Sequence, residues 1–290
     1  MPITDPLTRE THFGLDCLRI ETRHSVAIVA LHGGQLLSWT PRGERDVLWR
    51  STIMQPPPGA LRGGVPVCWP WFGSQGPAGS PSHGFARTST WELAQLQHSS
   101  PDSVCLTLQP AADSGAASVA GLLVTLTLHV GDTLTQTVVT RNLGSTPYAL
   151  TQALHSYFGV ADAGQIRIEG IAGATYFDKL QGQGAFVQPT RFDATAACDR
   201  VYHDVTGPYR LTDPLWRRQI VIESTGSQSL VVWNPGAERS QTITDLTPDA
   251  WRGFYCLEVA NAGPDVVLLA PGAEHQLSQT IRLQPWTGGA

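Results

Sequence analysis

The sequence predicts an all-β protein, built as a large antiparallel sandwich or as a closed barrel. Apolar and polar residues alternate along many short segments, which is the two-residue period of a half-buried strand. Between these segments, 29 Gly and 21 Pro supply frequent turn residues. Sustained helical periodicity with capping residues is nearly absent. We expect one domain covering residues 1–290, because large β domains often exceed about 200 residues.

The strongest strand pattern covers Leu122–Val130, where large apolar residues occupy every second position. Gly131-Asp132 interrupts the pattern and Leu134–Thr140 resumes it, which predicts a hairpin. Asp265–Leu269 and Gln276–Leu283 flank Pro271-Gly272 and predict a second hairpin. Further strands are predicted at Gln165–Ile171, Arg218–Glu223, Ser229–Trp233 and Gly253–Val259.

Composition excludes several classes of function. A net charge of −5 and a pI near 6.0 argue against nucleic-acid binding, which favours a basic face. No apolar run is long enough for a membrane span, and the N-terminus lacks a signal-peptide pattern, so we expect a soluble cytoplasmic protein. Five Cys without CxxC spacing indicate free thiols and neither a disulfide framework nor structural zinc.

The basic residues are almost all Arg, since Lys179 is the single Lys among the 19 basic residues. Schiff-base chemistry therefore has one candidate side chain. Any anion site must rely mainly on Arg, whose planar fork suits phosphate. Motifs for nucleotide binding, zinc proteases and α/β-hydrolases are missing from the chain.

The segment Leu61–Gly73 combines an arginine, a Gly-Gly pair and three aromatic residues. Arg62 and the adjacent glycines allow a ligand to approach the backbone closely. Trp69, Trp71 and Phe72 offer flat apolar faces that suit a sugar ring. The alternative is a loop whose aromatic side chains fill the core.

The segment Ser82–Arg87 places His83 and Arg87 four residues apart among small residues. Both side chains are candidates for one ligand site if the segment is a loop. The alternative is a structural histidine and an arginine that pairs with a nearby carboxylate such as Glu92.

A histidine and a glutamate stand in two apolar strand patterns far apart in the sequence. His155 lies within Ala153–Phe158, and Glu258 lies within Tyr255–Asn261. A buried carboxyl costs free energy unless it is paired or used, and burial raises its pKa into the range that suits proton transfer. The alternative is a structural Glu–Arg pair beside a core histidine. Asp199, at the start of another predicted strand, is a weaker candidate.

Taken in order, these segments resemble the aldose 1-epimerase superfamily and, most closely, its hexose-6-phosphate mutarotases. The similarity covers nearly the whole chain, from Leu31–Leu36 to the turn Leu269–Gly272. It rests on the combination of RGGVPVCWPWFG, SHGFAR, LHSYF and CLEVAN in this order.

The resemblance implies a large antiparallel β-sandwich of the galactose-mutarotase type, a supersandwich. It implies that His155 is the general acid and Glu258 the general base, with Arg62, His83, Arg87 and Asp199 around a sugar phosphate. Arg62 and Arg87 are then the expected phosphate partners, and no metal or other cofactor is expected. We also expect a monomer. One departure is Ser82, where some relatives have Gln before the histidine, which affects fine specificity.

Three alternatives remain at this point. The first is a non-catalytic carbohydrate-binding or regulatory protein on the same fold. The second is a glycosidase or lyase, which requires a second carboxylate, and Asp199 is the only candidate for it. The third is a mutarotase for unphosphorylated aldoses.

Overall fold

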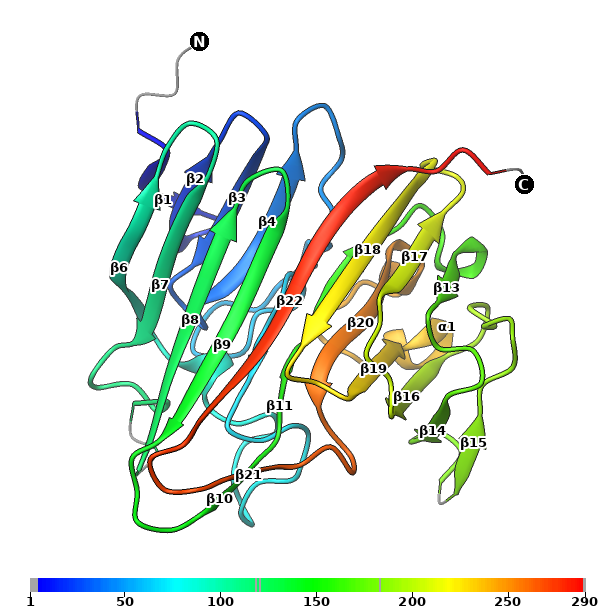
Figure 1. The fold of residues 1–290 in the computed structure, drawn as a ribbon. Coiled ribbons are helices and arrows are strands. Elements are labelled where there is room, and N and C mark those ends of the chain that lie inside the picture. The colour runs from blue at the N-terminus through cyan, green and yellow to red at the C-terminus, as the bar shows by residue number, and fades with distance from the viewer. Residues whose placement is uncertain (1–4, 118, 120, 183, 289–290) are drawn as a thin grey trace.

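The computed structural model describes residues 5–117, 119, 121–182 and 184–288, and their fold is a two-layer arrangement of antiparallel sheets (Figure 1). One layer is an eight-stranded sheet that we call the long sheet. Its strands, in spatial order, are β13 (Arg167–Glu169), β17 (Tyr209–Asp213), β18 (Arg218–Thr225), β22 (Glu274–Pro285), β9 (Leu134–Asn142), β8 (Leu122–Val130), β7 (Val104–Pro110) and β6 (Trp91–Ser99).

The second layer lies behind the long sheet in Figure 1 and contains two sheets. The first is a four-stranded sheet of β1 (Leu7–His12), β2 (Leu15–Glu21), β3 (Ser25–Ala30) and β4 (Gln35–Pro41). The second, the site sheet, runs β15 (Ala185–Val187), β14 (Thr175–Asp178), β16 (Cys198–His203), β19 (Ser229–Asn234), β20 (Phe254–Asn261), β11 (Gln152–Leu154) and β5 (Val67–Cys68), and β12 (Tyr157–Gly159) also pairs with β20.

The remaining elements are short. β10 (Tyr148–Leu150) and β21 (Val267–Leu269) form a two-stranded sheet. Helices are limited to α1 (Gly236–Ser240) and three 3-10 turns at Ala86–Thr88, Ala163–Gln165 and Ala250–Gly253 among the residues described. None of these helices is long and apolar enough to cross a membrane.

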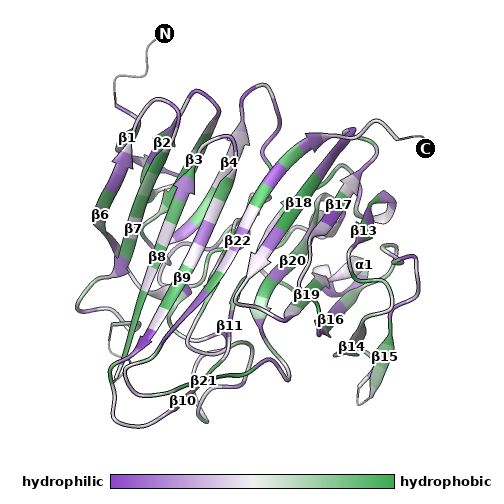
Figure 2. Cartoon of the chain, viewed as in Figure 1, coloured by the Kyte–Doolittle hydropathy of each residue, from purple (hydrophilic) through white to green (hydrophobic). Residues whose placement is uncertain are grey.

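The all-β prediction is confirmed, and the strand patterns explain why the chain folds this way. The β8–β9 hairpin pairs Val130 with Leu134 across the predicted turn. Along β8 the buried residues are those at every second position, and bands of alternating hydropathy mark β8 and β9 in Figure 2. The predicted strand at Gln165–Ile171 is shorter in the structure, because a 3-10 turn at Ala163–Gln165 precedes β13.

The predicted C-terminal hairpin is wrong. Pro271-Gly272 does form the connection, but β21 pairs with β10 and β22 pairs with β18 and β9. The connection lies against the end of β9, where the Asn142 N–H donates to the Ala273 carbonyl and the Gly272 N–H donates to the Asn142 carbonyl. These two bonds direct β22 onto β9 rather than back onto β21.

One large apolar cluster fills the space between the layers, with members from Leu18 to Ile281. Strand β20 shows how the core positions the site. Tyr255, Leu257 and Val259 point into this cluster, so the alternating residues Cys256 and Glu258 point to the opposite face of the site sheet.

Candidate active site

A break between two strands positions His155. β11 ends at Leu154 and β12 begins at Tyr157, so the single strand predicted around the histidine is interrupted. Both strands pair with β20, Leu154 opposite Val259 and Tyr157 opposite Cys256. The His155 N–H leaves the sheet pattern and donates to the Pro66 carbonyl at 3.0 Å. The histidine is thereby fixed next to the middle of β20.

His155 and Glu258 meet. Nε2 of His155 lies 3.3 Å from Oε1 of Glu258, and the two residues are 8% and 1% exposed. Within the described chain, neither Nδ1 of His155 nor Oε2 of Glu258 has a hydrogen-bond partner. No arginine forms an ion pair with this glutamate in that part of the chain, in contrast to the structural Glu–Arg pair considered above.

Burial shifts both pKa values toward the neutral forms. Desolvation raises the pKa of Glu258 well above its usual value, and Lys179 and Arg87 oppose the shift only in part. Desolvation also lowers the pKa of His155, and the nearby His83, Arg62 and Arg87 lower it further. The pair therefore holds one transferable proton, because Glu–COOH with neutral His and Glu–COO⁻ with HisH⁺ contain the same number of protons.

Tyr157 and Arg62 support the ring of His155. The Tyr157 ring stacks on the imidazole with centroids 4.9 Å apart and an interplanar angle of 8°. Nη1 of Arg62 donates to the Tyr157 hydroxyl at 2.9 Å, and Nε donates to Oδ1 of Asp245 at 3.0 Å. Arg62 thus reaches the site with two of its nitrogens already bonded.

His83 is held as a neutral hydrogen-bond donor. Its Nδ1 accepts from the Gly73 N–H at 3.3 Å, so the ring proton is on Nε2. Burial, reinforced by Arg87, Lys179 and Arg62, lowers the pKa of His83 to about 3. Its φ of +64° is a conformation that non-glycine residues rarely adopt, and it costs on the order of 1–3 kcal/mol.

Arg87 extends from the 3-10 turn at Ala86–Thr88. Its Nη2 donates to the Ser82 carbonyl at 2.7 Å, while its buried Nε has no partner among the described residues. Gly84 is required between them, because a Cβ at that position would lie 2.0 Å from the Trp69 carbonyl oxygen. Ser82 itself lines the cavity.

Asp199 lies between two cations that the sequence did not single out for this site. Its Oδ1 is 3.5 Å from Nζ of Lys179, and its Oδ2 is 3.6 Å from Nη1 of Arg239. Nζ of Lys179 also lies 5.0 Å above the Phe72 ring. The single lysine was a visible signal in the sequence, whereas nothing distinguished Arg239.

These groups converge on one cavity of about 290 Å³ on the face of the site sheet. All six residues predicted for the site line it. The complete lining is Arg62, Phe72, Ser82, His83, Arg87, His155, Lys179, Asp199, Val231, Trp233, Arg239, Ile243 and Glu258. Of the three aromatic residues singled out in Leu61–Gly73, Phe72 lines the cavity, whereas Trp69 and Trp71 are buried away from it and Nε1 of Trp69 donates to Thr140. Trp233 supplies the second aromatic wall.

The family model for aldose 1-epimerases matches residues 16–282. The chain belongs to the aldose 1-epimerase family. It is 32% identical over 289 residues to a protein of Escherichia coli named "Putative glucose-6-phosphate 1-epimerase", covering 97% of this chain and 95% of that one. A Salmonella typhimurium protein of the same name is 34% identical, with coverage of 90% and 88%.

Solved structures place this family member among the mutarotase folds. The crystal structure described as "a putative mutarotase" from Salmonella typhimurium superposes with a TM-score of 0.88 at 29% identity, covering 98% of this chain and 96% of that one. A galactose mutarotase-like protein of Clostridium acetobutylicum gives 0.73 at 14% identity, covering 98% and 100%. The predicted galactose-mutarotase type of sandwich is therefore confirmed.

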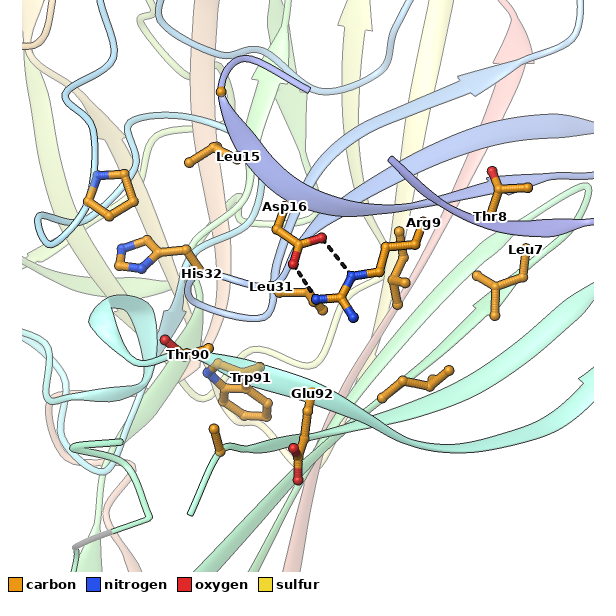
Figure 3. Close-up of a pocket in the computed structure, with 15 residues that line it drawn as sticks. Leu7, Thr8, Arg9, Leu15, Asp16, Leu31, His32, Thr90, Trp91 and Glu92 are labelled. Carbon is orange, nitrogen blue, oxygen red and sulfur yellow. Dashed lines mark hydrogen bonds and ion pairs between the residues drawn. The ribbon is translucent and has the colours of Figure 1, made fainter. Parts of the chain in front are cut away.

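This aldose 1-epimerase family member also has a larger hollow, of about 700 Å³, away from the site (Figure 3). It lies between β1–β2 and β6, and its wall is mostly apolar, with Leu15, Leu31 and Trp91 among its residues. Arg9 of β1 and Asp16 of the neighbouring β2 form a bidentate pair on one wall of it. Glu92, considered above as a partner for the site arginines, lines this hollow instead.

Three donors in the site have the composition of a metal set. The ligand atoms of His155, Cys256 and Glu258 all lie within 4.8 Å of one another. An ion there would take ligand atoms from both members of the buried His155–Glu258 pair. It would also face Arg87 and Lys179, whose charges already act on Glu258. The arrangement suits proton transfer better than a resident cation.

Proposed function

We propose that this chain interconverts the α and β anomers of a hexose 6-phosphate by acid/base-catalysed ring opening. The observation that carries the proposal is the 3.3 Å contact between His155 Nε2 and Glu258 Oε1 in a cavity bordered by cations. Membership of the aldose 1-epimerase family supports the reaction, and two relatives named as glucose-6-phosphate 1-epimerases support the substrate.

The reaction requires two proton transfers and no redox step. Glu258, ionised, takes the proton from the anomeric O1 hydroxyl while His155, protonated on Nε2, donates to the ring oxygen O5. The C1–O5 bond breaks and C1 becomes an aldehyde carbon. Rotation about C1–C2 presents the other face of the carbonyl, and O5 attacks again with the two roles reversed. Each positioned transfer contributes about 10²- to 10⁴-fold.

The desolvated setting favours this cycle. Burial disfavours the ionised form of the pair, in which both catalytic groups carry charge. Opening the ring converts that form into neutral Glu258 and neutral His155, and ring closure restores it. The pair ends each turnover with the proton count with which it began, so no external proton donor is needed.

The remaining residues would bind and orient the sugar. His83, neutral with its proton on Nε2, is a donor for a sugar oxygen. Asp199 is an acceptor for hydroxyls, and Trp233 and Phe72 offer apolar faces for ring C–H groups. The cavity cations supply the field for a phosphate dianion, which the protein's net charge of −5 would otherwise repel.

The two alternatives from other classes have less support. A glycosidase would use Asp199 as a second carboxylate, yet both of its oxygens face cations. A binding protein without catalysis would gain little from a buried glutamate whose Oε2 lacks a partner in the described chain.

The decisive experiment is anomer exchange measured by NMR on the purified protein, with glucose 6-phosphate, glucose and galactose as substrates and EDTA present. We expect rapid exchange. At low substrate concentrations, glucose 6-phosphate should exchange faster than glucose or galactose. Binding of the sugar phosphate without exchange would instead favour the non-catalytic alternative. Activity that chelation abolishes and a divalent ion restores would contradict a metal-free mechanism.

A further inference from the structure

The cations at the cavity differ in how firmly they are held. Arg62 donates from two nitrogens, to Asp245 at 3.0 Å and to the Tyr157 hydroxyl at 2.9 Å. Its side chain is 26% exposed and that of Asp245 only 14%. A phosphate approaching Arg62 would have to compete with a largely buried carboxylate that is already hydrogen-bonded to it.

Lys179 and Arg239 are held more loosely. Their contacts to Asp199, at 3.5 and 3.6 Å, are longer than a charge-assisted hydrogen bond of about 2.7–2.9 Å. The two side chains are 48% and 53% exposed, whereas Asp199 is 14% exposed. Both can therefore turn toward a new partner without breaking a short bond or leaving a buried position.

The backbone brings these two cations to one carboxylate. Lys179 follows β14 directly, and its N–H donates to the Asp199 carbonyl on the neighbouring β16 at 2.9 Å. Arg239 comes from α1, which follows β19 on the other side of β16. The Phe72 ring lies under the ammonium group of Lys179 and limits where its stem can lie.

The charge balance of the cavity fits a dianion. Asp245 compensates Arg62, and the one carboxylate of Asp199 compensates a single charge of the Lys179–Arg239 pair. One charge of that pair remains, together with Arg87, whose buried Nε has no partner in the part of the chain described. A sugar phosphate carries about −1.5 to −2 charges near neutral pH.

We infer that Lys179 and Arg239 close on the 6-phosphate together with Arg87, and that Asp199 holds these two cations in place until the phosphate arrives. The inference rests on the proposed function and specifies its phosphate subsite. Arg62 then supports Tyr157 and His155 and does not bind the phosphate. Release of Lys179 and Arg239 also frees the Asp199 carboxylate to accept from sugar hydroxyls, so phosphate binding prepares the sugar site.

The test compares Lys179→Ala and Arg239→Ala with Arg282→Ala, a matched control on β22 that is 47% exposed and paired with Glu223 at 3.3 Å. NMR exchange gives kcat and KM for glucose 6-phosphate and for glucose. Each site variant should raise KM for the phosphorylated sugar about tenfold, the lower range for a hydrogen bond to a charged group. KM for glucose should not rise, because glucose carries no phosphate, and the control should match the wild type in kcat and KM for both sugars.

A second measurement separates the role of Asp199 from a purely structural one. Calorimetry with inorganic phosphate as the probe should show tighter binding to Asp199→Asn than to the wild type, because a competing carboxylate is gone. Weaker phosphate binding would overturn the holding role of Asp199.

The outcomes also separate this inference from the proposed function. If the wild type exchanges anomers but the Lys179→Ala/Arg239→Ala double variant keeps its KM for glucose 6-phosphate, the subsite is wrong and the mutarotase stands. An equal rise in KM for both sugars would likewise overturn the subsite. A wild type that exchanges no hexose would remove the proposed function and this inference with it.

Discussion

The two hollows of this protein differ in how far they remove charged side chains from water, and their sizes do not predict this difference. The one between β1–β2 and β6 holds about 700 Å³, and the one on the site sheet about 290 Å³. In the larger hollow, the charged pair Arg9–Asp16 is exposed, with side chains 67% and 50% accessible. In the smaller one, Glu258 is 1% exposed and leaves Oε2 unpartnered within the described residues.

The difference follows from what burial does to charge. An exposed ion pair is screened by water, gains little free energy and perturbs no reactive group. A desolvated carboxyl next to a desolvated imidazole shifts both pKa values and makes proton transfer between the protein and a ligand accessible near neutral pH. The volume of a hollow is therefore a poorer guide to chemistry here than the state of the titratable groups that line it.

The largest expected effect comes from removing either member of the buried pair. His155→Ala and Glu258→Gln should each lower kcat for anomer exchange by at least about a hundredfold, because each removes one positioned proton transfer. The affinity for glucose 6-phosphate, measured by calorimetry, should change much less. Near-normal exchange in either variant, with chemistry limiting the rate, would show that the residue has been given the wrong role.

A smaller effect is expected from the support of His155. Arg62→Ala should lower kcat about tenfold, and equally on glucose 6-phosphate and on glucose. A loss of this size corresponds to the free energy of about one hydrogen bond to a charged group. The physical reason is that the Arg62 charge lowers the pKa of His155 and makes its protonated form a stronger acid. Parallel exchange assays on the two sugars measure the effect.

Tyr157→Phe is the matched variant for this prediction. It removes the hydroxyl that Arg62 bonds but keeps the ring that stacks on His155 and the Arg62–Asp245 pair. We expect a weaker loss of kcat, again equal on both sugars. A rise in KM confined to glucose 6-phosphate in Arg62→Ala would instead support the original interpretation of Arg62 as a phosphate ligand.

The sequence predicted the fold class and singled out both members of the buried His155–Glu258 pair, but not their geometry. Period-2 patterns identify strands such as β8 because burial of alternate residues is a local property. The contact between His155 and Glu258 depends on the pairing of β11 and β12 with β20, about a hundred residues away, and no local pattern encodes that pairing.

The residues that were missed lack a local signal for the same reason. Arg239 lies on a one-turn helix and Asp245 in a loop, where a charged residue is ordinary. Both become part of the site only through the fold. The wrong C-terminal hairpin has a similar cause, since Pro271-Gly272 marks a turn but does not specify which strand β22 will pair with.

The same buried glutamate should also cost stability, and the cost should depend on pH. The folded pKa of Glu258 is raised above its unfolded value, so the folded state binds the proton more tightly. The stabilisation that the protonated Glu258 gives the folded state is complete below the unfolded pKa, near 4.5. It is lost as the pH rises toward the folded pKa. Glu258→Gln should therefore raise Tm by at least about 2 °C at neutral pH.

Thermal denaturation of wild type and Glu258→Gln from pH 4.5 to 8 measures this gain, which should grow as the pH rises. A rise in Tm of constant size across that pH range would mean that side-chain packing, and not the charge of Glu258, sets the difference between the variant and the wild type. A lower Tm in the variant would mean that the ionised carboxylate stabilises the fold through a partner such as His155, contrary to the direction of the pKa shift.

The smallest effect is expected in the larger hollow. Asp16→Asn removes the charge that Arg9 faces in Figure 3, yet both side chains are at least half exposed. Because water replaces the lost contact, Tm should change by less than about 1 °C, and the pair should weaken further with salt in the wild type. Exchange on both sugars should be unaffected, since the pair lies outside the cavity that holds His155 and Glu258. A tenfold loss of exchange in this variant, with Tm intact, would mean that the larger hollow takes part in the reaction, and the contrast between exposed and desolvated charge would no longer explain where the chemistry occurs.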